Sequence, residues 1–130
     1  MDYPKQVLQD IYWAYREPTF DTIEDFVTEI KHYYKTITNT KLAIDLDEIL
    51  FNFPKVRIQY VKYNDGDVDE PQVDLEADNG TSFSAKELLY KLHNEVGVNL
   101  FEDDNCYFEG LTFADIDDDD IPVYFLDTGS

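Results

Sequence analysis

The chain has 130 residues, of which 29 are Asp or Glu and 10 are Lys or Arg, so its formal net charge is −19. The length favours a single domain over 1–130, and an aromatic content of 15% argues against disorder driven by charge. Apolar runs are too short for a membrane span, the first residues lack a signal-peptide pattern, and phosphate binding needs Lys and Arg. We therefore expect a cytoplasmic protein that binds neither membranes nor nucleic acid directly.

Two helices are expected at the beginning of the chain. Residues 5–15 repeat apolar side chains at helical spacing, and Pro18 marks a stop. Residues 22–37 repeat them again, after a pair, Asp21 and Glu24, that resembles a capping box. The short connection between the two segments predicts antiparallel neighbours.

A β-hairpin is expected next. Residues 41–53 leave two interpretations open, a strand or a short helical turn. Residues 56–63 alternate apolar and polar side chains as a strand does, and 73–77 alternate in the same way after a loop at 65–66. This predicts two antiparallel strands joined by that loop.

A third helix follows the hairpin. The Asn-Gly pair at 79–80 is a turn signal, and Ser84 with Glu87 forms an S-x-x-E capping box. The helix is expected over about 85–96, with Gly97 as its stop.

A second hairpin is expected at the end of the chain. Its strands are predicted over 106–113, with a bulge at Gly110, and over 121–126. Pro122 lacks a donor for the ladder, so it predicts an edge strand or the first residue of a strand. The element order is ααβββαββ or ααββαββ. It predicts one α+β domain, with an antiparallel sheet of four to five strands and two N-terminal helices and one central helix on one face.

The acidic residues are concentrated in two stretches of the chain. Residues 92–130 hold 11 acids and no Lys or Arg. The stretches 65–78 and 102–120 together hold 16 of the 29 acids. Crowding like charges costs folding free energy, and solubility needs a net charge of only about 2–8. A solvated surface or adaptation to a salty cytoplasm is one explanation; the clustering favours a surface that is complementary to a basic partner.

The first acidic stretch has part of a calcium-binding pattern. Asp65, Asp67, Asp69 and Glu76 fall at positions 1, 3, 5 and 12 of an EF-hand loop. Position 6, which requires Gly, is Glu70, and the flanks read as strands. We therefore expect neither an EF-hand nor a bound cofactor, and only weak divalent-ion binding remains as an alternative.

Catalytic and metal-binding side chains are few. His32, His93 and Cys106 lie too far apart in sequence to suggest a metal or nucleophile site. Cys106 is expected to pack among aromatic residues, and both histidines are expected at helix surfaces or caps. The chain also lacks phosphate-binding and nucleophile-elbow motifs. These observations predict a protein that is not an enzyme.

Several aromatic residues crowd the two N-terminal segments. They are Tyr12, Trp13, Tyr15, Tyr33 and Tyr34. Neighbouring positions on a helix cannot all face inward, so some of these rings are expected at the surface. Tyr and Trp are enriched among the residues that dominate protein interfaces.

The second half of the chain contains a set of short motifs: Phe83-Ser84 with the run from Glu87 to Asn94, Asp104 with the run from Tyr107 to Leu111, and Pro122-Val123-Tyr124 with the ending Gly129-Ser130. With these motifs the chain resembles the immunity proteins of bacterial polymorphic-toxin and contact-dependent growth inhibition systems. It implies a small cytosolic α+β protein that neutralises a cognate toxin, often a nuclease, by binding it.

Charge and resemblance lead to the same hypothesis: an immunity protein that binds a cognate basic toxin. Carboxylates would steer association and desolvated aromatics would hold the complex. The expected electrostatic face consists of Asp65, Asp67, Asp69, Glu70, Asp117, Asp118, Asp119 and Asp120. The alternatives are a DNA mimic that inhibits a DNA-binding or defence enzyme, and a small metal-dependent binding module that uses the 65–76 loop.

Overall fold

The computed structural model describes residues 3–64, 66–101 and 106–129. The elements follow one another as β1 (Gln6–Val7), β2 (Trp13–Ala14), α1 (Ile23–Thr38), β3 (Ile49–Phe51), β4 (Lys55–Gln59), β5 (Lys62–Asn64), β6 (Asp67–Asp69), β7 (Gln72–Glu76), β8 (Phe83–Ser84), α2 (Ala85–Glu95), the 3₁₀ helix η1 (Gly97–Asn99), β9 (Tyr107–Ile116) and β10 (Pro122–Gly129). The fold is α+β.

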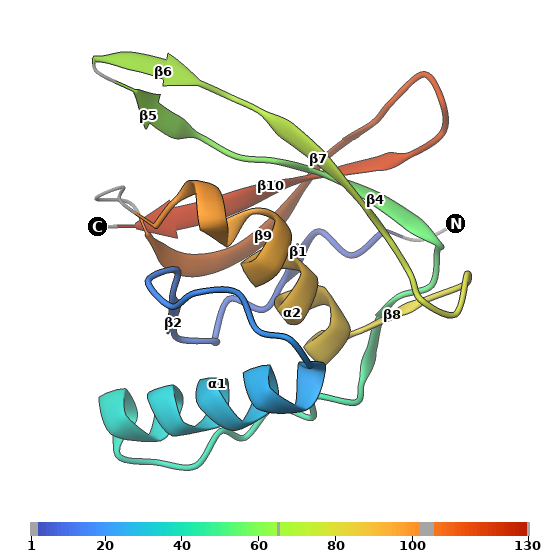
Figure 1. The fold of residues 1–130 in the computed structure, drawn as a ribbon. Helices are drawn as coiled ribbons and strands as arrows, with labels where there is room; N and C mark the ends of the chain where they lie inside the picture. The colour runs from blue at the N-terminus through green and yellow to red at the C-terminus, as the bar shows by residue number, and fades with distance from the viewer. Residues whose placement is uncertain (1–2, 65, 102–105, 130) are drawn as a thin grey trace.

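The main sheet has six strands in the order β1-β9-β10-β4-β7, and β2 also pairs with β9. Two small sheets, β3-β8 and β5-β6, complete the strands. In Figure 1, α2 lies against the main sheet and α1 lies on the far side of α2, so both helices are on one side of the strands. Neither helix is both long and apolar enough to cross a bilayer, as far as the described residues show.

The sheet is mixed, so the expectation of an antiparallel sheet was wrong. β10 runs parallel to β4, with Tyr124 opposite Ile58, while β4-β7 and β9-β10 are antiparallel. A short turn forces the two strands of a hairpin to be antiparallel. β4 and β10 belong to different hairpins, which are connected through α2. A connection of this length allows the two strands to run either parallel or antiparallel.

Residues 5–15 do not form the expected helix. Apart from Tyr12, their apolar side chains are buried, but β1 and β2 both pair with β9: Val7 lies opposite Leu111 and Trp13 opposite Phe108. Leu8 has φ +64, which no α-helix permits. Pairing satisfies backbone groups along the outer edge of β9 that would otherwise stay open, and this tertiary gain outweighs a weak helix propensity.

The other two helices form where they were expected. In α1 the N-cap is Thr22, whose side chain accepts from the Asp25 N–H; it lies one residue after the expected Asp21. In α2 the Ser84 side chain accepts from the Glu87 N–H at 3.2 Å, as the capping box predicts. The α-helix ends at Glu95 with Val96 as its C-cap, directly before the predicted stop at Gly97, and the 3₁₀ helix η1 follows.

Several local predictions in the strands are confirmed. Gly110 has φ +116 and sits where the β9-β10 register shifts, and Pro122 is the first residue of β10. Gly80 has φ +73, and its N–H donates to the Ala77 carbonyl in the predicted turn. In the ambiguous segment, only Ile49–Phe51 forms a strand, paired with β8.

Candidate partner-binding surface

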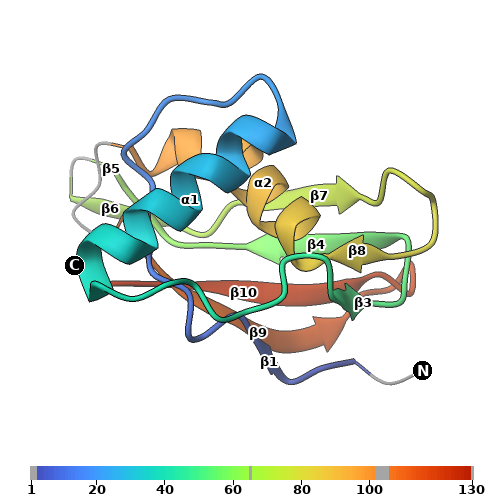
Figure 2. The same ribbon diagram turned by 90° about the horizontal axis from the view of Figure 1, so that it is seen from below.

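The acidic residues predicted to bind a partner fall into two groups at opposite ends of the sheet. Asp67 and Asp69 belong to β6, and Glu70 follows it, whereas residues 117–120 form the turn between β9 and β10. Figures 1 and 2 both place these segments at opposite ends of the sheet. Asp65 lies outside the described residues. The seven predicted residues that the structure describes therefore do not assemble into one face.

Asp117 stabilises its own turn. Its Oδ1 accepts from the N–H groups of Asp119 and Ile121, each at 2.9 Å, and its Oδ2 accepts from the Arg57 guanidinium. Asp120 has φ +61, a conformation that Asp tolerates better than most residues. Asp118, Asp119 and Asp120 are exposed, so three of the four predicted carboxylates in this turn are open to solvent.

The strands β4, β5, β6 and β7 form one continuous two-stranded ribbon. Lys55 opposes Glu76 at its root, Asn64 opposes Asp67 near its tip, and the register between these pairs does not shift. The Tyr60 N–H bonds the Pro71 carbonyl at 3.1 Å where neither strand is assigned. β4 and β7 are part of the sheet, while β5 and β6 project beyond it as an arm (Figure 1).

The polarity of the ribbon reverses along its length. At the root, Val56, Ile58 and Leu75 face the core and polar side chains face the opposite, outer side of the sheet. Alternation places Tyr63 and Val68 on the outer side of the arm, where they are 50% and 58% exposed. Core packing does not account for an apolar pair that points away from the core.

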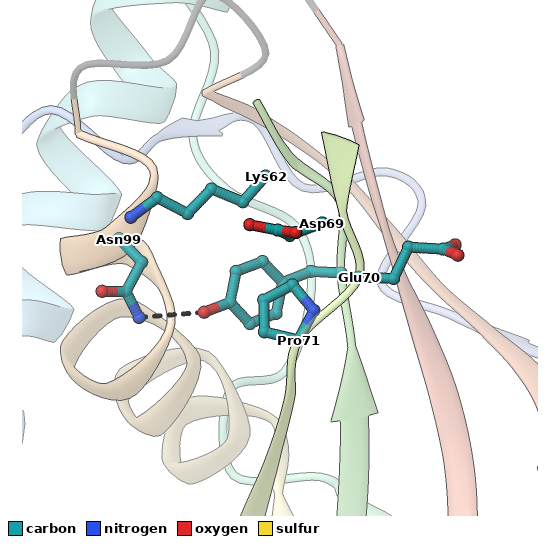
Figure 3. Close-up of a pocket in the computed structure, with 6 residues that line it drawn as sticks. Lys62, Asp69, Glu70, Pro71 and Asn99 are labelled. Carbon is teal, nitrogen blue, oxygen red and sulfur yellow. Dashed lines mark hydrogen bonds between the residues drawn. The ribbon is translucent and has the colours of Figure 1, made fainter. Parts of the chain in front are cut away.

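The inner side of the arm is polar. Tyr60, Lys62, Asp69, Glu70, Pro71 and Asn99 line a hollow there. Asn99 in η1 donates its amide to the Tyr60 hydroxyl at 2.9 Å, which ties the base of the arm to the end of α2. Figure 3 shows Lys62 and Asp69 on this side, while the Glu70 side chain points to the other side of the ribbon.

A second hollow, which we call the outer hollow, lies on the outer face of the sheet at the base of the arm. It encloses about 500 Å³ and is lined by Gln6, Gln9, Val61, Tyr63, Glu109, Phe125, Asp127 and Thr128. Two glycines allow side chains that line the hollow to lie close to the backbone. A Cβ on Gly129 would lie 2.5 Å from the Glu109 carboxylate, and one on Gly110 would lie 2.9 Å from the Gln9 amide.

Charge is balanced at the root of the ribbon. Arg57 donates to Asp74 at 2.7 Å and to Asp117, and Lys55 lies 3.6 Å from Asp74. The Arg57 guanidinium, donating hydrogen bonds to Asp74, holds the pKa of that carboxyl below its usual value. Asp74 and Asp117 are therefore already matched by cations of the same chain.

Charge is not balanced around the outer hollow. Within the described residues, no Lys or Arg forms an ion pair with Glu109 or Asp127. Asp127 is held by the Thr112 hydroxyl, which donates to its Oδ2 at 2.6 Å. The arm end of the outer face thus combines exposed apolar side chains with carboxylates that have no Lys or Arg partner among the described residues.

The histidines and the cysteine form no common site. His93 is fully buried, so its expected place on a helix surface was wrong: α2 packs this face on the core. Cys106 is buried as predicted, and its Sγ accepts from Arg16 Nε at 2.9 Å. In the part of the chain that the structure describes, no three His, Cys, Asp or Glu side chains gather as metal ligands.

The exposed aromatic residues were only partly foreseen. Tyr12 is 51% exposed and stacks on Tyr34, whereas Trp13 and Tyr15 are buried. Sequence reasoning missed Tyr63 and Val68. The alternation of side chains along the hairpin could have indicated them. Once the register across the 65–66 turn is known, alternation places both residues on the outer side of the ribbon, where the other side chains are polar.

Comparisons of this chain with protein-family models, with curated protein sequences and with solved structures found no match. The resemblance to immunity proteins therefore stays a prediction.

Proposed function

We propose that this chain is an immunity protein that binds a basic bacterial toxin in the cytoplasm and blocks it. The observation that carries the proposal is the apolar, unmatched acidic end of the outer face: Tyr63 and Val68 on the arm, with Glu109 and Asp127 beside them. Protein interfaces of this kind combine a buried apolar centre with charges that meet opposite charges on the partner.

The two acidic ends of the molecule have different roles in this proposal. The net charge of −19 draws a basic protein toward the chain and raises the rate of association. The turn residues Asp118, Asp119 and Asp120 contribute to this long-range attraction. The arm and the outer hollow then form the contact from which water is excluded, and they set the lifetime of the complex.

The test is a pull-down with the tagged chain from the native lysate, at low salt and at about 0.5 M salt. At the higher salt, charges more than a few ångströms apart are screened from one another, so partners held by charge alone are lost. The tagged chain is compared with a variant carrying Tyr63→Ser and Val68→Ser. Tyr12→Ser is the matched control, because Tyr12 is as exposed as Tyr63 and lies against α1. We expect one basic protein to be retained at high salt by the wild type and the control, and lost from the double variant.

The retained protein is then expressed in a bacterial host, alone and together with the chain. Growth arrest by the partner alone, relieved by the wild-type chain but not by the double variant, is the expected result. A harmless partner, or many basic proteins bound only at low salt, would overturn the immunity proposal. Displacement of several unrelated DNA-binding proteins from duplex DNA would favour the DNA-mimic alternative instead.

A further inference from the structure

The outer hollow has the chemistry of a site for one cationic side chain. Its carboxylates, Glu109 and Asp127, have no Lys or Arg partner among the described residues, and Tyr63 and Phe125 supply aromatic surface next to them. A cation gains from both features, because carboxylates pair with it and ring faces attract it.

The hollow is formed by four separate segments. Val61 and Tyr63 come from the ribbon, Phe125 and Asp127 from β10, Glu109 from β9, and the two glutamines from the N-terminal segment. The Gln9 amide donates to the Leu111 carbonyl at 3.0 Å, so its position is fixed by the strand beside it. This distinguishes the hollow from the β9-β10 turn, where the acids all belong to one short loop.

An arginine fits this combination better than a lysine. The guanidinium is planar, stacks on aromatic rings and offers parallel N–H donors to a carboxylate, whereas the ammonium is a compact and strongly hydrated charge. The Thr112 hydroxyl already donates to Oδ2 of Asp127 and holds that carboxylate in place. Fixing the acceptor lowers the entropy lost when a donor arrives.

We propose that the outer hollow binds the guanidinium of an arginine side chain presented by the partner. This deepens the proposed function and rests on it for the identity of the partner, but the hollow itself can be probed without that partner. The arginine would lie between Tyr63 and Phe125 and pair with Asp127, Glu109 or both.

The probe is N-acetyl-arginine amide, titrated into the ¹⁵N-labelled full chain at low salt and followed by backbone amide shifts. Its uncharged isostere N-acetyl-citrulline amide and the lysine counterpart are titrated in parallel. We expect shifts confined to β5, β9 and β10 around the hollow, with a dissociation constant on the order of millimolar, as a single side chain supplies only a few kcal/mol. Citrulline should bind roughly tenfold more weakly, as loss of about 1.4 kcal/mol implies.

Two variants of equal charge change give the control. Asp127→Asn should weaken arginine binding roughly tenfold, whereas Asp118→Asn in the exposed turn should leave it unchanged. Equal shifts with citrulline, shifts spread over residues 117–120, equal effects of both variants, or no shifts at all would overturn the arginine site. None of these outcomes bears on the growth test, so failure of the site and failure of the immunity proposal are distinguishable.

Discussion

His93 lies among aromatic rings with both of its ring nitrogens bonded. Trp13 Nε1 donates to Nδ1 at 3.1 Å, so Nδ1 must be the acceptor of a neutral ring. The proton is then on Nε2, which lies 2.9 Å from the Pro18 carbonyl. Phe20 and Phe26 pack against the same ring. One histidine thereby joins α2, α1 and the segment between β2 and α1 in a single tautomer.

Acid should destabilise the fold through this residue. Burial lowers the pKa of His93 below its ordinary value of 6.5, because the charged ring would lose its water. As the pH falls through 6.5, the unfolded chain takes up the proton first, so the free energy of unfolding declines until the pH reaches the lower folded pKa. Each unit of that depression corresponds to about 1.4 kcal/mol. Urea unfolding between pH 7.5 and 5 measures it.

The comparison is made with His93→Gln, whose amide can accept from Trp13 and donate to Pro18 but does not titrate. The carboxylates titrate alike in both proteins, so the difference in unfolding free energy isolates His93. We expect that difference to change across this pH range. A constant difference for His93→Gln would contradict the assignment.

At the scale of elements, the ribbon keeps one strand register but has two different ends, one packed in the core and one exposed. Its root supplies Val56, Ile58 and Leu75 to the core, and its tip carries the exposed Tyr63 and Val68. None of the arm residues belongs to the buried core cluster. The arm therefore exposes apolar surface to water, which is unfavourable, and contributes nothing to the core. Exposed apolar surface of this kind is typical of a segment that binds a partner.

The arm should be removable without loss of the fold. Deleting the opposed pairs Lys62–Asp69 and Tyr63–Val68 shortens both strands by two residues and preserves the alternation of faces. We expect the free energy of unfolding to change by less than about 1 kcal/mol, as for surface changes that leave the core intact. Retention of a basic partner at high salt should be lost. Urea unfolding and the retention assay measure the two effects.

Destabilisation by several kcal/mol after this deletion would mean that the arm is structural. Unchanged stability with unchanged retention would place the partner contact elsewhere on the molecule. Tyr12→Ser serves again as the control for loss of an exposed tyrosine.

At the scale of the whole molecule, the net charge of −19 acts against folding. Most of the 29 carboxylates cannot be matched by 10 cations, and the compact state brings them closer together than the unfolded chain does. The cations that form ion pairs in the described residues do so at the root of the ribbon and around α2. The excess charge therefore remains on the rest of the surface.

Added salt should raise the melting temperature. The screening length falls from about 30 Å at 0.01 M to about 8 Å at 0.15 M, which weakens the repulsion. A gain of about 1 kcal/mol corresponds to roughly 4 °C in a domain of this size. Asp118→Asn, Asp119→Asn and Asp120→Asn combined should raise the low-salt melting temperature and reduce its dependence on salt. Equal melting temperatures at low and high salt would contradict this account.

The sequence by itself determined the features that depend on neighbours along the chain. The capping serine of α2, the apolar stripe of α1, the alternation in both hairpins, the bulge at Gly110 and the excess of acid follow from residues within a few positions of one another. Local propensity and side-chain spacing are sufficient to predict these features, because other local conformations would lose the capping hydrogen bond or the buried apolar face.

Only the tertiary structure decided the features that depend on distant partners. The open edge of β9 drew residues 5–15 into strand pairing, and the path through α2 set β10 parallel to β4. Long-range contacts also buried His93 and placed the carboxylates of β6 and of the β9-β10 turn at opposite ends of the sheet. Apolar spacing predicts that a side chain will be buried, but the surface that buries it comes from residues that can lie more than a hundred positions away.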